Sequence, residues 1–76
     1  MNTKNKKIAI TTEYITLSGF LKFCGLAGTG GESKELILSG AVLVDGEACA
    51  MRGKKLRPGN IISIAGSNEV YEVTTP

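Results

Sequence analysis

The residues with the clearest chemical meaning are the cations between positions 52 and 57. We call this stretch the basic segment, because Lys or Arg fills four of its six positions: Arg52, Lys54, Lys55 and Arg57. The whole chain has a formal charge of +2, so the other seventy residues together carry −2. Crowded like charges repel one another unless a polyanion relieves the repulsion, which favours a phosphate-bearing partner, above all a nucleic acid. A solvated basic loop without a partner is the competing interpretation.

Catalytic and metal chemistry find little support in the residue types. The chain has no histidine, and its acids are scattered without an evident pair for proton transfer. Cys24 and Cys49 are 25 positions apart, far too few ligands for a zinc site. Each cysteine has apolar neighbours, so we expect both to be buried and reduced. The sequence therefore predicts no enzyme, no metal, no cofactor and no small-molecule substrate.

Length and composition indicate one small globular domain. The 76 residues are 42% hydrophobic and 21% charged, which is too apolar for a disordered tail. We expect a flexible basic arm over residues 1–7 and a single domain over residues 8–76. No apolar run approaches the roughly 18 residues of a membrane span, and the first residues lack a signal-peptide core. A cytoplasmic monomer that does not contact a membrane is the expectation.

The first half of the chain predicts a strand followed by a short helix. Residues 7–15 are rich in β-branched types and indicate a strand. Thr16 can cap a helix that Gly25 ends, and its apolar stripe is Leu17, Phe20, Leu21 and Cys24. Phe23 lies off this stripe, so we expect it to be partly exposed.

A glycine-rich stretch separates this helix from a second one. It contains Gly25, Gly28, Gly30 and Gly31, but no Lys follows where a P-loop would need it. Thr29 as N-cap and Glu32 three residues later instead match a capping box. We therefore predict a second helix from about residue 30 to 39, which ends at Gly40 and buries Ser33, Leu36 and Ile37.

The second half of the chain predicts antiparallel strands. Residues 41–44 and 47–50 flank Asp45-Gly46, a strong signal for a two-residue hairpin turn. Strands over residues 61–64 and 69–74 follow the basic segment. Tyr14 and Tyr71 could stack on bases, but strand tyrosines more often pack, which we favour for both. The fold class is α+β, with two short helices on a small, mostly antiparallel sheet.

The order and spacing of these pieces resemble the S-four RNA-binding domain family, which is also called the αL motif. The resemblance covers about residues 15–66, and its closest look-alikes are small stand-alone bacterial members. Its motifs here are Leu17…Phe20-Leu21-Lys22, Thr29-Gly30-Gly31-Glu32-Ser33-Lys34, Gly40-Ala41-Val42-Leu43-Val44-Asp45-Gly46 and Arg52-Gly53-Lys54-Lys55-Leu56-Arg57-Pro58-Gly59-Asn60.

The resemblance implies a concave basic surface, formed by the two helices and the hairpin, that docks on structured RNA. A helix N-terminus suits phosphate, and glycines there allow close approach of an RNA backbone. The partner implied is ribosomal RNA or another structured RNA. The implied RNA-facing residues are Thr29, Gly30, Gly31, Lys34, Arg52, Lys54, Lys55 and Arg57, with Lys22 as a further candidate for a phosphate contact.

Two departures from the family pattern make the helical face less basic than usual. Many relatives begin the first helix with Arg-Leu-Asp and the second with Ser-Arg, where this chain has Thr16-Leu17-Ser18 and Thr29-Gly30. Binding would then depend mainly on the basic segment. The alternatives are a protein-interaction adaptor, which would use the sheet or the Leu26-Ala27 loop, and a DNA-bound regulator. No long recognition helix supports the DNA interpretation.

Overall fold

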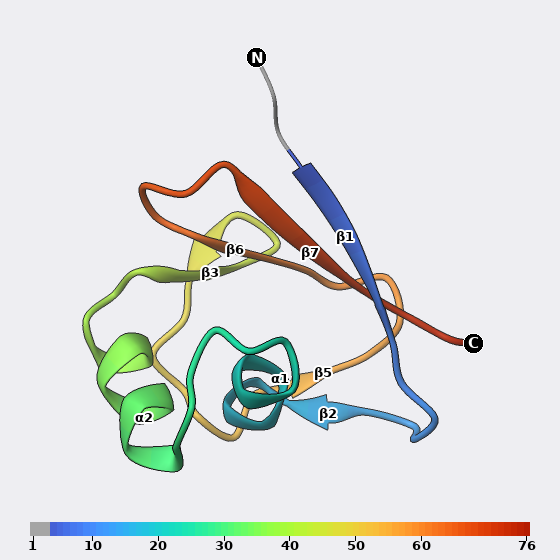
Figure 1. Cartoon of the computed structure of the whole chain (residues 1–76), viewed down its shortest axis with the longest axis horizontal. Helices are drawn as coiled ribbons and strands as arrows, with labels where there is room; N and C mark the ends of the chain where they lie inside the picture. Colours follow the sequence, from blue (N-terminus) through green and yellow to red (C-terminus); the bar gives the residue numbers. More distant parts are fainter. Residues whose placement is uncertain (1–3) are drawn as a thin grey trace.

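A computed structural model describes residues 4–76 and shows a two-layer α+β arrangement (Figure 1). The α+β class expected from the sequence is confirmed. In chain order the elements are β1 (Lys4–Ala9), β2 (Ile15–Thr16), α1 (Leu17–Phe23), α2 (Gly30–Leu38), β3 (Val42–Val44), β4 (Glu47–Ala48), β5 (Lys55–Leu56), β6 (Ile61–Ile64) and β7 (Glu69–Thr74).

The strands form one five-stranded sheet and one small ladder. The sheet has the order β1-β7-β6-β3-β4, and its pairs are antiparallel except for the parallel pair β1–β7. The two-stranded ladder joins β2 to β5 in antiparallel register. In Figure 1, α1 and α2 lie together on one side of the sheet, and the β2–β5 ladder is next to α1.

The hydrophobic core lies between the helices and one face of the sheet. Alternate strand residues point into it, which is the period-two pattern expected of a sheet with one buried face. Phe20 of α1 is fully buried and meets the ring of Tyr71 edge-on, with ring centroids 6.4 Å apart. The buried apolar residues are Ile10, Leu17, Phe20, Leu21, Ala27, Ile37, Val42, Val44, Leu56, Ile62, Tyr71 and Val73.

The N-terminal strand differs from the prediction at both ends. Residues 4–7, expected in a flexible arm, belong to β1 and pair in parallel with β7. The strand ends at Ala9, so residues 10–14 connect β1 to β2 rather than extending it to Ile15. Backbone pairing with β7 outweighs the weak strand propensity of a Lys- and Asn-rich sequence. Residues 1–3 of the expected arm lie outside the described residues.

The helix boundaries follow the predicted capping residues closely. Thr16 caps α1 by accepting a hydrogen bond from the Gly19 amide, and Thr29 caps α2 by accepting one from the Glu32 amide. Beyond the helix ends, Gly25 and Gly40 have φ angles of +80° and +82°, the conformation that glycine adopts without strain. α2 ends at Leu38, one residue earlier than expected, with Ser39 as C-cap.

The predicted capping box at α2 is wrong in one half. The Glu32 carboxylate accepts from the amide of Gly28 at 2.9 Å, not from the amide of the N-cap residue Thr29. Ser33 and Ile37 are buried as expected, whereas Leu36 is half-buried.

The strands of the second half are confirmed, although the hairpin is shorter than expected. Asp45 and Gly46 both have positive φ, at 53° and 87°, as a two-residue hairpin turn of the primed type requires. The hairpin strands are Val42–Val44 and Glu47–Ala48, and one further backbone bond, from the Cys49 amide to the Val42 carbonyl at 3.0 Å, follows them.

Neither cysteine is fully buried, so the expectation of core cysteines is only partly right. Cys24 and Cys49 are half-buried free thiols that pack against the core. Burial raises the pKa of the Cys24 thiol to about 11, against a smaller opposing effect of Lys6. The Cys24 thiol is therefore protonated near neutral pH and is a poor nucleophile.

Candidate nucleic-acid interface

The basic segment contains a strand that the sequence did not reveal. Leu56 is fully buried and pairs with Ile15, while Lys55 pairs with Thr16. Successive side chains of a strand point to opposite faces. Leu56 is buried, and the residues on either side of it, Lys55 and Arg57, are exposed. The buried leucine thus anchors the segment, and its charged neighbours are held at the surface.

Backbone hydrogen bonds attach the basic segment to the start of α1. The amide of Leu17 donates to the carbonyl of Lys54 at 2.8 Å, and the amide of Ser18 donates to the carbonyl of Arg52 at 3.1 Å. The first amides of a helix have no partner within the helix. The basic segment satisfies two of them, which fixes the backbone from which its cations extend.

The first turn of α2 lies against the same part of α1. Ser33 is a fully buried polar residue, and its hydroxyl donates to the carbonyl of Ser18 at 3.4 Å. Ser18 therefore connects the basic segment on one side to α2 on the other. Lys34 follows Ser33 and is exposed. These contacts bring together two predicted parts of the RNA surface that are about twenty residues apart in the sequence.

The far end of the basic segment is fixed to the hairpin turn. The Arg57 amide donates to Asn60 Oδ1 at 2.7 Å, and Asn60 Nδ2 donates to Asp45 Oδ2 at 2.8 Å. The other carboxylate oxygen, Asp45 Oδ1, accepts from the Ile61 amide at 2.9 Å. Asp45 thus has a structural role at the tip of the hairpin, where it holds the turn that follows Arg57.

The four cations of the basic segment are exposed and lack acidic partners. Across residues 4–76, no carboxylate lies within 4.0 Å of the charged groups of Arg52, Lys54, Lys55 or Arg57. The ion pair found among residues 4–76 joins Lys6 to Glu69, both outside the basic segment. The positive charge of the basic segment is therefore available to an external anion.

Tyr14 belongs to this surface, which the sequence-based expectation of packing missed. Its residue surface is 38% exposed, and its ring lies 5.0 Å from Lys55 Nζ and 5.8 Å from the guanidinium carbon of Arg57. The pairing of Ile15 with Leu56 places Tyr14 beside Arg57 in the antiparallel register. Only the β2–β5 pairing reveals this proximity, so no local sequence signal could have found it. For Tyr71, packing is confirmed, since it is 3% exposed.

The start of α2 presents exposed glycines, as expected. Thr29, Gly30 and Gly31 are exposed, and across residues 4–76 the amides of Gly30 and Gly31 have no hydrogen-bond acceptor. The carboxylate of Glu32, however, accepts from Gly28 at this same helix end. Its negative charge offsets part of the helix dipole, so this end attracts phosphate less strongly than an uncharged one would.

Lys22 lies one helical turn beyond Ser18, the α1 residue that bonds to the basic segment. It is exposed in the last turn of α1, four residues after Ser18 and therefore on the same side of the helix. Four residues correspond to about 6 Å along a helix axis, within the reach of a lysine side chain. Lys22 thus extends the surface by one turn.

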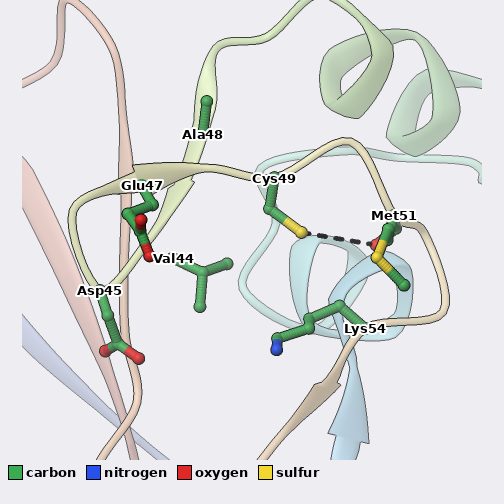
Figure 2. A pocket seen from close by; sticks show the side chains of 7 residues that line it. All are labelled: Val44, Asp45, Glu47, Ala48, Cys49, Met51 and Lys54. Carbon is green, nitrogen blue, oxygen red and sulfur yellow. Dashed lines mark hydrogen bonds between the residues drawn. The ribbon is translucent and has the colours of Figure 1, made fainter.

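A hollow of about 220 Å³ separates the hairpin from the basic segment (Figure 2). In Figure 2, Asp45 and Glu47 lie on the hairpin side and Lys54 on the opposite side. The Cys49 thiol faces the carbonyl of Met51 at 4.0 Å. The two carboxylates would repel a phosphate group, so we do not assign an anion site to this hollow.

Metal-binding clusters and membrane-spanning helices are absent from the described part of the chain. Among residues 4–76, no three His, Cys, Asp or Glu side chains come together as metal ligands would. None of the helices there is long and apolar enough to cross a bilayer.

Comparison with known proteins gives two results. The family model for the S4 domain matches residues 8–74. This is the S-four family that the sequence motifs resemble. The probable ribosome maturation protein RlbA of Bacillus subtilis (strain 168) is 41% identical over 59 residues. The alignment covers 78% of this chain and 83% of that relative.

Proposed function

This chain belongs to the S4 domain family, and we propose that it is a non-catalytic RNA-binding protein. The observation that supports this most is the basic segment, whose four exposed cations have no carboxylate partner among residues 4–76. Phosphate groups along an RNA backbone would relieve the repulsion among these cations.

The proposed RNA surface extends from the basic segment across the start of α1 to the first turn of α2. Ser18 is hydrogen-bonded to Arg52 of the basic segment and to Ser33 of α2, so a phosphate backbone could follow the surface without crossing a gap between separate elements. The proposed contacts at the α2 end are Thr29, Gly30, Gly31 and Lys34, with Lys22 extending the surface along α1. The rest of the contacts come from Arg52, Lys54, Lys55 and Arg57.

Ribosomal RNA, free or in an assembly intermediate, is the partner class that we propose. The similar protein from Bacillus subtilis is described as a probable ribosome maturation protein, which motivates this choice. Bacterial ribosomes are assembled in the cytoplasm, so we place the protein there, acting as a monomer. Crosslinking in cells followed by sequencing of the attached RNA would identify the partner.

An adaptor function is the second candidate, favoured by one observation. Phe23 is 62% exposed and borders a hollow of about 350 Å³ beside the end of β1. The Leu26-Ala27 loop is a weaker docking site than the sequence suggested, because Ala27 is buried and Leu26 is half-buried. An apolar contact at Phe23 would depend little on salt, unlike a phosphate contact.

Salt dependence of binding separates the two candidates. Four to five phosphate contacts should give a slope of log K against log salt of roughly −3, at about −0.7 per contact. The measurement is the affinity of the purified protein for fluorescently labelled fragments of ribosomal RNA at several salt concentrations. A flat response, or no binding at low salt, would contradict the proposed function.

A further inference from the structure

Tyr14 has the position and surroundings of a stacking platform for a base. We propose that it stacks on an unpaired nucleotide of the bound RNA, while Lys55 and Arg57 hold the phosphates on either side of that nucleotide. This inference rests on the proposed RNA-binding function and adds a selectivity for unpaired over duplex RNA.

The contacts of Tyr14 differ from those of a packing tyrosine. Its backbone carbonyl accepts a hydrogen bond from the Thr12 hydroxyl at 2.8 Å, and Ile15 next to it pairs with Leu56. The backbone is thus fixed, whereas the residue is 38% exposed and two cations lie near its ring. A ring held in this way loses little conformational freedom when a base stacks on it.

The two cations explain why a nucleotide fits this place better than an isolated aromatic ligand. One nucleotide combines a flat base with a phosphate one ribose away, and here a flat ring lies 5.0 Å and 5.8 Å from two cationic groups. Stacking of bases on aromatic rings tolerates all four bases, and the cations supply sequence-independent phosphate contacts. A lysine over an exposed ring can also turn away at small cost and leave that face to a base.

An unpaired nucleotide is required because the bases of a duplex already stack on one another. RNA-binding proteins commonly stack aromatic side chains on splayed-out bases of loops, bulges and ends. Tyr14 therefore adds affinity for looped or single-stranded RNA and little for a continuous duplex. The basic segment alone would not make this distinction, because its targets are phosphates.

The test uses two tyrosine variants and two RNA probes. Tyr14→Phe keeps an aromatic ring, and Tyr14→Leu removes it while keeping an apolar side chain. The probes are a single-stranded RNA and a blunt duplex with the same number of phosphates. We expect Tyr14→Leu to weaken binding of the single strand about fivefold to a hundredfold, with Tyr14→Phe close to wild type. Duplex affinity and the salt slope should change little, because tyrosine is uncharged.

Each alternative outcome has a distinct signature. Equal losses on both probes with a shallower salt slope would mean that Tyr14 only positions Lys55 and Arg57, and would overturn the stacking proposal. Unchanged binding of the single strand by Tyr14→Leu would overturn it as well. If Lys54→Ala with Lys55→Ala also leaves binding of both probes unchanged, the proposed RNA surface itself fails. Thermal melting of each variant is the control that checks whether the fold persists.

Discussion

Two regions of this small domain pair a tyrosine with cations, and they do so differently. On the β1–β7 edge, which we define by Lys6, Glu69 and Tyr71, Lys6 Nζ lies 3.3 Å from the Glu69 carboxylate and 5.8 Å from the Tyr71 ring. The Tyr71 hydroxyl donates to the same carboxylate at 2.6 Å. On the basic segment, Lys55 and Arg57 lie over Tyr14, and no carboxylate of residues 4–76 balances them.

The comparison teaches that a cluster of cations indicates a ligand only where the fold does not already balance it. Lysines on an edge strand also have a structural reason, since charge on an edge discourages pairing with another chain. β1 is such an edge strand of the five-stranded sheet. β5 is also an edge strand, but its only lysine is Lys55. This reason therefore leaves Arg52, Lys54 and Arg57 unexplained, and an external polyanion is the simplest explanation of their charge.

Removing charge from each region in turn should have unequal effects. Lys54→Ala with Lys55→Ala should weaken RNA binding roughly 10- to 100-fold, because two charge-assisted contacts to phosphate are lost. The salt slope should become shallower by about 1.4, and the loss should be similar for all RNA sequences. Affinity measured at several salt concentrations checks both expectations.

The matched control removes the same charge from β1. Lys6→Ala with Lys7→Ala should leave RNA affinity within a few-fold of wild type, while melting reflects the loss of one exposed ion pair, about 0.2–1 kcal/mol. Equal losses of RNA affinity in the two double variants would show that net charge, and not the basic segment, determines binding.

Gly30→Glu tests the α2 end of the surface. Gly30 lacks a positive φ, and no heavy atom lies within 4 Å of a Cβ built there, so the fold should accept the side chain. The new carboxylate would repel phosphate at the helix start, and we expect roughly tenfold weaker binding. Gly30→Ala is the matched control, with a small side chain but no charge, and should lose less affinity than Gly30→Glu. Equal affinities of the Glu and Ala variants would remove this helix end from the surface.

Alkaline unfolding tests the β1–β7 edge. The hydrogen bond to Glu69, together with burial, raises the pKa of Tyr71 to about 12 from an ordinary value of 10. Between those values the unfolded chain loses the Tyr71 proton before the folded protein does, so stability falls as pH rises. Tyr71 should therefore contribute a loss of about 1–2 kcal/mol between pH 10 and 12, less than the full linkage value because Glu69 is partly exposed.

Tyr71→Phe isolates this contribution, since it removes the hydroxyl and keeps the ring against Phe20. Its free energy of unfolding, measured by denaturant titration at several alkaline pH values, should fall less steeply than that of wild type. Identical pH profiles would mean that the Tyr71 hydrogen bond does not persist in solution.

The smallest expected effect concerns Glu32. Glu32→Gln keeps an oxygen that can accept from Gly28 but removes the negative charge from the α2 start. We expect RNA affinity to rise about two- to threefold, with a loss of a few tenths of a kcal/mol in helix stability. Glu35→Gln, one turn further along α2, is the matched control and should change affinity less. An equal gain in both variants would indicate a general effect of net charge.

Local patterns in the sequence predicted most of the elements correctly. The apolar stripe of α1, the threonine caps and the Asp45-Gly46 turn each depend on residues within one or two turns of chain. Such interactions have fixed spacings, so a sequence can reveal them. The α+β class and the exposure of the basic segment followed from the same patterns.

The features that were missed depend on contacts between distant residues. β1 over residues 4–7 exists because β7 pairs with it, and β5 exists because Ile15 pairs with Leu56. The placement of Tyr14 beside Lys55 and Arg57 follows from the second of these pairings. Neither pairing has a local signature, so strand propensity alone could not show them. The bond from the Gly28 amide to the Glu32 carboxylate is local by contrast, and it was missed because the capping-box pattern predicts the Thr29 amide as the donor.

Mapping the RNA contact by NMR tests the central claim most directly. Amide chemical shifts of the isotopically labelled protein would be followed while a ribosomal RNA fragment is added. We predict the largest changes at residues 52–57 and 29–34 and at Tyr14, with the β1–β7 edge nearly unchanged. Changes centred on Lys6, Glu69 and Tyr71, or on the hollow beside Phe23, would contradict the assignment of RNA binding to the basic segment.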